Sequence, residues 1–148
     1  VTNMVGMFAE TGLTTLDLST FNTSKVINMQ SMFYSSSIES LDLSNFDTKN
    51  VTNMGGMFYA CPLLTDLKLS NFDTRNVTDM GAMFAQCGRL TYLDLSSFDT
   101  SNVTDMGGMF TRSSDLQQVV VGCNWTTENA DTRNMFDGAG ISEVTVVC

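Results

Sequence analysis

A repeat of 25 or 26 residues constrains this chain more than any other feature of its sequence. All eleven methionines and all ten phenylalanines fall in columns of that repeat. The string Val-x-x-Met-x-x-Met-Phe begins at Val1, Val26, Val51, Val77 and Val103. We therefore expect residues 1–112 to form regular repeats and residues 113–148 to form a degenerate repeat that caps the C-terminal end.

Each repeat has the pattern of one strand followed by one helix. In residues 64–72 apolar and polar residues alternate around Leu67 and Leu69, which predicts a short strand with its leucines inward. The pair 73–74, Asp-Thr, is typical of a helix N-cap, and Val77, Met80 and Phe84 would share one face of a helix of about ten residues. One such unit cannot bury its own apolar face, but a stack of units can.

The predicted fold class is therefore an α/β repeat solenoid of the leucine-rich-repeat kind. It would be right-handed, with a parallel sheet on one side and short helices on the other. Its strands are expected near Leu16, Leu41, Leu67, Leu93, Val119 and Val144. Paired glycines within the predicted helices either let neighbouring helices approach or mark a tighter turn, and the sequence leaves both explanations open.

The methionine columns are expected in the core, because methionine is unbranched and fills irregular space. A copper site made of methionines is the less favoured explanation, since copper sites also favour cysteine or histidine and these positions must face the core. The chain has no histidine, so Ser-His-Asp, Cys-His and His-based zinc sites are absent and we do not expect an enzyme.

The sequence also resembles a known family. The segments "LDLSNFDTKNVTNMGGMFYAC" and "LDLSSFDTSNVTDMGGMF" resemble the BspA-like leucine-rich repeat of bacterial, mycoplasma and protist surface proteins. The resemblance implies a secreted or cell-surface protein, with adhesion to host matrix or to other cells as its activity. It brings no catalytic residues. The final repeat, "VVVGCNWTTENADTRNMF", departs from the pattern, and we interpret Trp125 as part of a cap, with a Trp-centred binding spot as the alternative.

Charge and apolar runs limit the partners. The net charge of -9 disfavours nucleic acid and anionic lipid surfaces. No apolar run approaches the roughly 20 residues of a membrane span, so we expect no direct insertion into a membrane. The chain starts at Val1 within a repeat and carries no signal peptide or lipidation motif, which suggests a mature fragment of a longer protein.

Four cysteines form two pairs of equivalent positions. Cys123 and Cys148 each follow a predicted strand by a few residues, and Cys61 and Cys87 each follow a predicted helix. Parallel strands lie about 4.8 Å apart, within the Cα separation that a disulfide accepts. We favour a disulfide between Cys123 and Cys148, and keep both a disulfide and free buried thiols open for the other pair.

Two further sets of residues recur with the repeat. Asp47, Asp73 and Asp99 form an acidic column, for which helix capping is the favoured explanation and calcium the less favoured one. Five Asn-x-Ser/Thr sequons are candidate glycosylation sites if the host is a eukaryote. These are Asn22, Asn50, Asn76, Asn102 and Asn124.

The outward side of the predicted sheet is the expected binding surface. Its side chains vary from repeat to repeat on a constant scaffold, as a ligand surface permits. The candidate ligand-binding residues are Asp17, Asp42, Asp66, Lys68, Tyr92 and Asp94. We expect a protein or glycan partner on host or neighbouring cells. The alternative function is structural: the ends of the stack would self-associate into a surface layer or filament.

Overall fold

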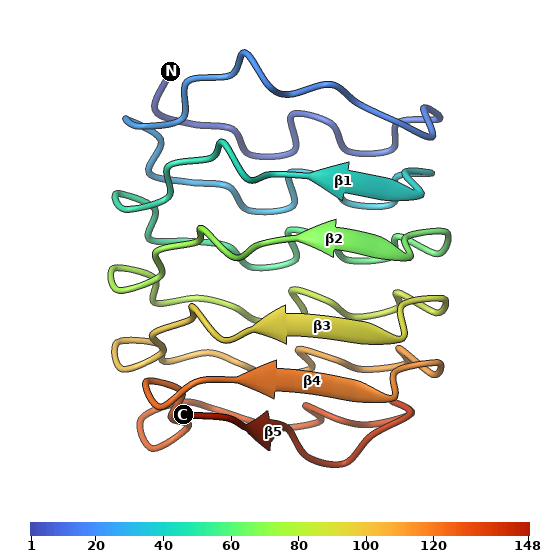
Figure 1. Cartoon of the computed structure of the whole chain (residues 1–148), viewed down its shortest axis with the longest axis vertical. Helices are drawn as coiled ribbons and strands as arrows, with labels where there is room; N and C mark the ends of the chain where they lie inside the picture. The colour runs from blue at the N-terminus through green and yellow to red at the C-terminus, as the bar shows by residue number, and fades with distance from the viewer.

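The computed structural model describes residues 1–148 and contains five short strands and no helix. The strands are β1 (Ser40–Asp42), β2 (Asp66–Lys68), β3 (Tyr92–Leu95), β4 (Gln118–Val121) and β5 (Thr145–Val146). They lie one above another in chain order, and the rest of each repeat returns behind them (Figure 1). The structure contains no helix that could cross a bilayer.

Parallel pairing joins equivalent residues of successive repeats. β1 and β2 form a two-stranded sheet, and β3, β4 and β5 form a three-stranded sheet. The register places Leu41 beside Leu67 and Leu93 beside Val119. Strands are thus present at these four predicted positions because inward leucines or valines alternate there with outward side chains. β5 begins one residue after Val144, and residues around Leu16 form no strand.

The return run of each repeat, which follows its strand, has a second line of parallel pairing. Isolated bridges join each residue of one column to its equivalent in the next repeat. The column consists of Asn3, Asn28, Asn53, Asp79, Asp105 and Asp131. Of 70 backbone hydrogen bonds, only 7 lie within strands, so most of the regular bonding between repeats is in turns and irregular segments.

The predicted α/β repeat solenoid with leucine-rich-repeat helices is wrong. Where a helix was expected after Val77, the N–H groups of Met80, Ala82 and Phe84 donate to carbonyls of the next repeat. An α-helix needs those N–H groups for bonds to residues four positions earlier. The structure is instead a small, mostly β domain with two parallel sheets, and the glycines of the return run mark turns.

Backbone conformation also excludes the helices. Ala82 and Gln86 have φ values of 54° and 57°, in the left-handed region that a right-handed helix cannot contain. The same two columns are left-handed in every repeat. One column is Gly6, Ser31, Gly56, Ala82, Gly108 and Asn134, and the other is Glu10, Ser35, Ala60, Gln86, Arg112 and Gly138.

One apolar core runs through all the repeats. A single cluster of 35 buried residues includes most of the methionines, as the repeat predicted, although Met7 is exposed. Six phenylalanine rings stack along the core with centroids 5.6–5.9 Å apart: Phe8, Phe33, Phe58, Phe84, Phe110 and Phe136. Such ring pairs stabilise the stack beyond simple burial. The result is a rigid support for both outer faces.

Candidate functional site

Five of the six residues predicted to bind ligand lie on the exposed face formed by the strands, which we call the strand face, whereas Asp17 is exposed but lies outside every strand. Tyr92 is 51% exposed, and Lys68 lies 3.9 Å from Asp42 as an exposed ion pair. Asp66 and Asp94 are also exposed. None of these residues lines any of the three hollows described below.

Three of these carboxylates have a local structural role. Asp17, Asp42 and Asp94 each accept a hydrogen bond from the backbone N–H of the serine two residues later. The serine hydroxyls and N–H groups lower the pKa of Asp17 and Asp42. These acids therefore stabilise local turns as well as facing solvent.

The acidic column of Asp47, Asp73 and Asp99 also closes turns. Each carboxylate accepts from the N–H two residues later, as a helix cap would, but no helix follows. Ion pairs join Lys49 to Asp47 at 3.1 Å and Arg75 to Asp73 at 2.6 Å, and these contacts lower the pKa of both acids. No three Asp, Glu or Cys side chains come together as a metal-binding group.

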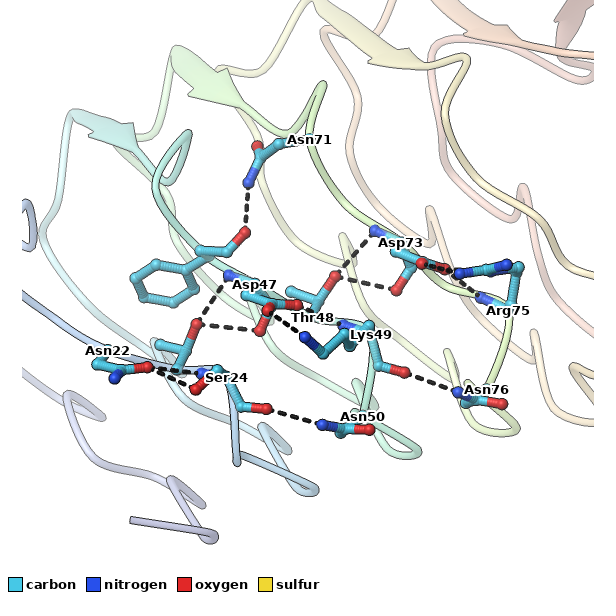
Figure 2. A network of polar contacts seen from close by, with 12 residues as sticks. Asn22, Ser24, Asp47, Thr48, Lys49, Asn50, Asn71, Asp73, Arg75 and Asn76 are labelled. Atoms are coloured by element: carbon cyan, nitrogen blue, oxygen red, sulfur yellow. Dashed lines mark hydrogen bonds and ion pairs between the residues drawn. The ribbon is translucent and has the colours of Figure 1, made fainter.

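A ladder of buried threonines lies beside this acidic column, and Figure 2 shows its member Thr48 next to Asp73. The Thr48 hydroxyl donates to the carbonyl of Asp73 and accepts from the N–H of the same residue, both at 2.9 Å. Thr74 makes the same two bonds to Asp99. Each hydroxyl thus satisfies both backbone groups of a residue in the next repeat, which keeps these buried groups from being unpaired.

The four cysteines form one disulfide and leave two free thiols. Cys123 and Cys148 form a disulfide, with their Cα atoms 5.2 Å apart. Cys61 and Cys87 are free and buried, so the candidate disulfide between them does not form. Their thiols donate instead to the carbonyls of Phe33 and Phe58. Burial raises the pKa of both thiols, which makes them unreactive.

The five sequon asparagines are all exposed, but their side chains differ in structural role. The amide groups of Asn50, Asn76 and Asn102 donate to backbone carbonyls of the preceding repeat at 2.7 Å. The carboxamide oxygen of Asn22 accepts from Ser24, and the Asn124 side chain makes no hydrogen bond. Three of the five amides are therefore already occupied in contacts between repeats.

The most extensive concave surface lies on the return run, behind the strands. Two adjoining hollows of about 720 and 410 Å³ share four lining residues, and together we call them the turn-face groove. The shared residues are Tyr59, Ala82, Asp105 and Gly107. None of the residues predicted from the sequence to bind ligand lines this surface.

The floor of the groove consists of residues with little or no side chain. In two adjacent columns of the return run, three successive repeats have only glycine or alanine: Gly55 and Gly56, Gly81 and Ala82, Gly107 and Gly108. The flanking repeats have Gln30 and Ser31 at one end, and Arg133 and Asn134 at the other. The floor therefore lacks side chains larger than a methyl group over three repeats, with Gly55 buried and the other five residues half-buried, and larger side chains close its ends.

Carboxylates form one wall. The Asp79 and Asp105 side chains accept hydrogen bonds from the N–H groups of Gly81 and Gly107, at 2.9 and 2.8 Å. A Cβ added to Gly81 would lie only 3.1 Å from the Asp105 carboxylate, so glycine allows this acid to lean over the floor. The bonded N–H groups fix the direction of both carboxylates.

The same wall ends in an ion pair. The Arg133 guanidinium contacts the Asp131 carboxylate at 2.6 Å. The hydrogen bonds and charge of Arg133 lower the pKa of Asp131 to about 2. Asp131 is therefore neutralised by its neighbour, whereas Asp79 and Asp105 have no basic partner within ion-pair distance.

Tyrosines form the opposite wall. The rings of Tyr34 and Tyr59 stack with centroids 5.4 Å apart and an interplanar angle of 5°. The Gln86 amide donates to the Tyr59 hydroxyl at 3.0 Å, which holds that ring in place. Beyond Gln86 the wall continues through Thr111 and Arg112, and the Arg112 guanidinium makes no ion pair.

The family comparison agrees with the repeat organisation. A family described as "Mycoplasma protein of unknown function, DUF285" matches residues 1–61 and 35–145. The chain belongs to the DUF285 family. This match supports a surface repeat protein only in general terms. No curated protein and no solved structure is significantly similar to this DUF285 chain.

A separate hollow of about 410 Å³ lies in the last repeat of the DUF285 chain. Trp125 lines it together with Phe136 and Val144, and the indole packs half-buried against the core. Both interpretations of Trp125, as a cover for the core and as part of a binding spot, remain consistent with this position. The turn-face groove is larger and is bounded by fixed polar groups, so it is the stronger candidate site.

Proposed function

We propose that this chain is a rigid ligand-binding module of a secreted or cell-surface adhesion protein, and that the turn-face groove is its binding site. One observation supports the proposal most strongly. Three successive repeats have only glycine or alanine on the floor of the groove, and larger side chains of the two flanking repeats close its ends. Clefts of this size are the usual location of ligand sites. The partner would be a protein or glycan on host or neighbouring cells.

The scaffold suits this role because its groove is formed before any ligand arrives. The phenylalanine stack and the threonine ladder fix each repeat against the next. A site that does not rearrange loses less conformational entropy when it binds. The proposal is of binding and not of catalysis, because the groove contains no histidine and its acids are held by backbone N–H groups.

Two observations support a location outside the cell. BspA-like surface proteins carry the DUF285 repeat, and the chain resembles that family. The Cys123–Cys148 disulfide fits an oxidising environment, where such bonds persist. Adhesion is the function that best combines an exterior location with a fixed groove.

The groove can be tested by filling its floor. The double variant Gly56→Asn/Gly108→Asn places a side chain in each hollow, at left-handed positions where asparagine is tolerated. Asn134 already occupies this column with a φ of 59°. The matched control is Gly6→Asn, in the same column with a φ of 61° but outside the groove.

Surface plasmon resonance would measure binding of the chain to purified fibronectin, laminin and collagen and to an array of glycans. We expect at least one of these probes to bind, and the double variant to weaken that binding at least tenfold while Gly6→Asn does not. No binding to any probe would contradict the proposed function. Equal binding by the double variant would move the site away from the groove.

Self-assembly remains the second candidate function, and exposed apolar side chains favour it. In the first repeat Leu13 is 56% exposed and Met7 43%, and in the last repeat Val146 is 60% exposed. Stacking one copy on another would cover these residues, and so would further repeats of the same protein. Light scattering over a concentration series tests this: a mass that rises with concentration supports assembly, and a constant monomer mass contradicts it.

A further inference from the structure

We propose that the turn-face groove recognises a neutral oligosaccharide, with Tyr34 and Tyr59 on one side and Asp79 and Asp105 on the other. The inference rests on the proposed function, because it assigns a ligand class to the same groove. It follows from the chemistry of the two walls and of the floor.

The tyrosine wall provides an apolar surface with polar tips. Aromatic rings pack against C–H groups, and a pyranose ring presents such groups on its faces. Tyrosine contributes this contact at a low entropic cost because it has few rotatable bonds. Here the two rings are further fixed by stacking on each other and by the bond from Gln86 to the Tyr59 hydroxyl.

The acidic wall provides oriented acceptors for hydroxyl groups. One oxygen of each of the Asp79 and Asp105 carboxylates accepts a backbone N–H group, and the other has no hydrogen-bond partner within the protein. Hydrogen bonds to a carboxylate are shorter and stronger than those to a neutral acceptor. Each free oxygen is therefore available to a sugar hydroxyl.

The groove offers donors as well as acceptors, which separates a glycan from a basic peptide. Arg112 has no ionic partner, and the Gln86 amide and Thr111 hydroxyl lie along the same wall. A hydroxyl both donates and accepts, so it can use both kinds of group. Lysine and arginine side chains only donate, so they cannot accept a hydrogen bond from Arg112 or from the Gln86 amide.

The balance of charge further selects a neutral sugar. Asp79, Asp105 and Asp137 have no basic partner within ion-pair distance, whereas Arg112 is the only arginine of the groove without an acidic one. A sialylated or uronic-acid chain would meet this excess of carboxylates.

The floor sets the size of the ligand. Backbone without side chains lets a flat ring approach closely. Three repeats at a spacing of about 4.8 Å give a floor of about 14 Å, which is long enough for a short oligosaccharide and more than a single sugar needs.

The test compares defined probes by isothermal titration calorimetry on the full 148-residue chain. Neutral probes are cellotetraose, maltotetraose, mannotetraose and N-acetylchitotetraose. The acidic probe is sialyllactose, and the basic probes are tetralysine and tetra-arginine. We expect at least one neutral tetrasaccharide to bind, and the acidic and basic probes to bind at least tenfold more weakly.

Two variants locate the binding with residues that the chain already uses in the same columns. Tyr59→Ala copies Ala85 and should weaken binding at least tenfold, because it removes half of the stacked pair. Asp105→Asn copies Asn53, keeps the oxygen that accepts the Gly107 N–H, and should weaken binding severalfold through loss of charge. Asp115→Asn, an exposed acid outside the groove, is the matched control and should bind normally.

Each other result overturns the inference in a distinct way. Preferential binding of a basic peptide, weakened by Gly56→Asn/Gly108→Asn, would replace the glycan with a peptide and leave the proposed function intact. Preferential binding of sialyllactose would contradict the neutral ligand. Binding lost in Tyr92→Ala but retained in Tyr59→Ala would place the site on the strand face. No binding by the tetrasaccharides, the peptides or the matrix proteins would contradict both proposals.

Discussion

The strand face and the turn-face groove are built from the same repeats but differ in what they expose. On the strand face, extended residues alternate, so every second side chain projects outward. On the turn face, each repeat has two left-handed residues four positions apart, and in three repeats glycine or alanine leaves the surface without large side chains. Both faces bond to the next repeat through the backbone.

The difference shows how one scaffold produces a surface of projecting side chains and a hollow one. A strand surface changes its chemistry by exchanging outward side chains. The turn surface changes its shape by omitting them over consecutive repeats, which creates depth at no cost to the bonds between repeats. A candidate site can therefore be found where the repeat has lost side chains, as well as where it has gained unusual ones.

The largest expected effect tests whether both faces share one core. Phe84→Ala should lower the free energy of unfolding by about 3–5 kcal/mol, because the ring is fully buried beneath the groove and stacks on two others. Leu93→Ala, behind the strands, should cost about 2–5 kcal/mol. Urea unfolding followed by circular dichroism measures both. A cost below about 1 kcal/mol for Phe84→Ala would show that the turn side is not tightly packed.

The next effect concerns the bonds that join the repeats between the two faces. Thr74→Val keeps the shape of the side chain but leaves the N–H and carbonyl of Asp99 without their partner. Unpaired buried groups should lower the free energy of unfolding by about 1–3 kcal/mol. Thr91→Val is the control, since Thr91 is exposed and its hydroxyl makes no bond, and it should stay within about 0.5 kcal/mol. Equal changes in the free energy of unfolding for the two variants would show that the threonine ladder does not stabilise the fold.

A smaller change in the free energy of unfolding has opposite signs for a left-handed turn and for the predicted helix. Ala82 has a φ of 54°, so Ala82→Gly should relieve strain and raise the free energy of unfolding by about 0.5–1 kcal/mol. In a helix the same change would lower it by about 1 kcal/mol. Thermal and urea unfolding would both report the sign. A destabilised Ala82→Gly chain would contradict the left-handed turn.

The smallest effect is a pH dependence on the turn face. The pKa of Asp131 lies near 2 because of Arg133, below its ordinary value of 3.8, so the folded chain favours the ionised form. Its contribution to stability should be complete above about pH 4 and be lost as the pH falls toward 2. Arg133→Gln should raise the Asp131 pKa in an NMR titration. An unchanged pKa would show that the ion pair does not form in solution, where exposed pairs contribute little.

Sequence reasoning succeeded where a residue's neighbours in the sequence determine its conformation. Alternating leucines located β1, β2 and β3, and the column spacing identified the disulfide between Cys123 and Cys148. Around Leu16 the same alternation did not produce a strand. The apolar columns correctly placed the phenylalanines and nearly all the methionines in the core.

The helix prediction failed because bonds to the next repeat override helical periodicity. Val77, Met80 and Phe84 have helical spacing, but the N–H groups of Met80 and Phe84 bond to the neighbouring repeat. Alanine and glutamine, ordinary helix formers, occupy left-handed positions at 82 and 86. Their side chains give no local signal of this, so the conformation depends on the stack as a whole.

The groove was missed for a related reason. The sequence signal for the groove was the run of glycine pairs. The sequence left open whether these glycines allow close helix packing or mark a tight turn. The column of Asp79, Asp105 and Asp131 also recurs with the repeat and had not been separated from the other acids. Predicting the site would have required knowing that these two columns lie side by side across three repeats.

The threonine ladder has a consequence for how such proteins can evolve. Each hydroxyl recognises only backbone atoms of the following unit, so one 26-residue unit is interchangeable with another at that joint. An in-frame duplication of the segment from Val77 to Asn102 would add a unit whose joints are already satisfied. The copy would bring its own Gly81 and Ala82, and would lengthen the floor of the groove by one step. Gene duplication could thereby change the length of the ligand that the groove binds, and the existing units would need no substitution.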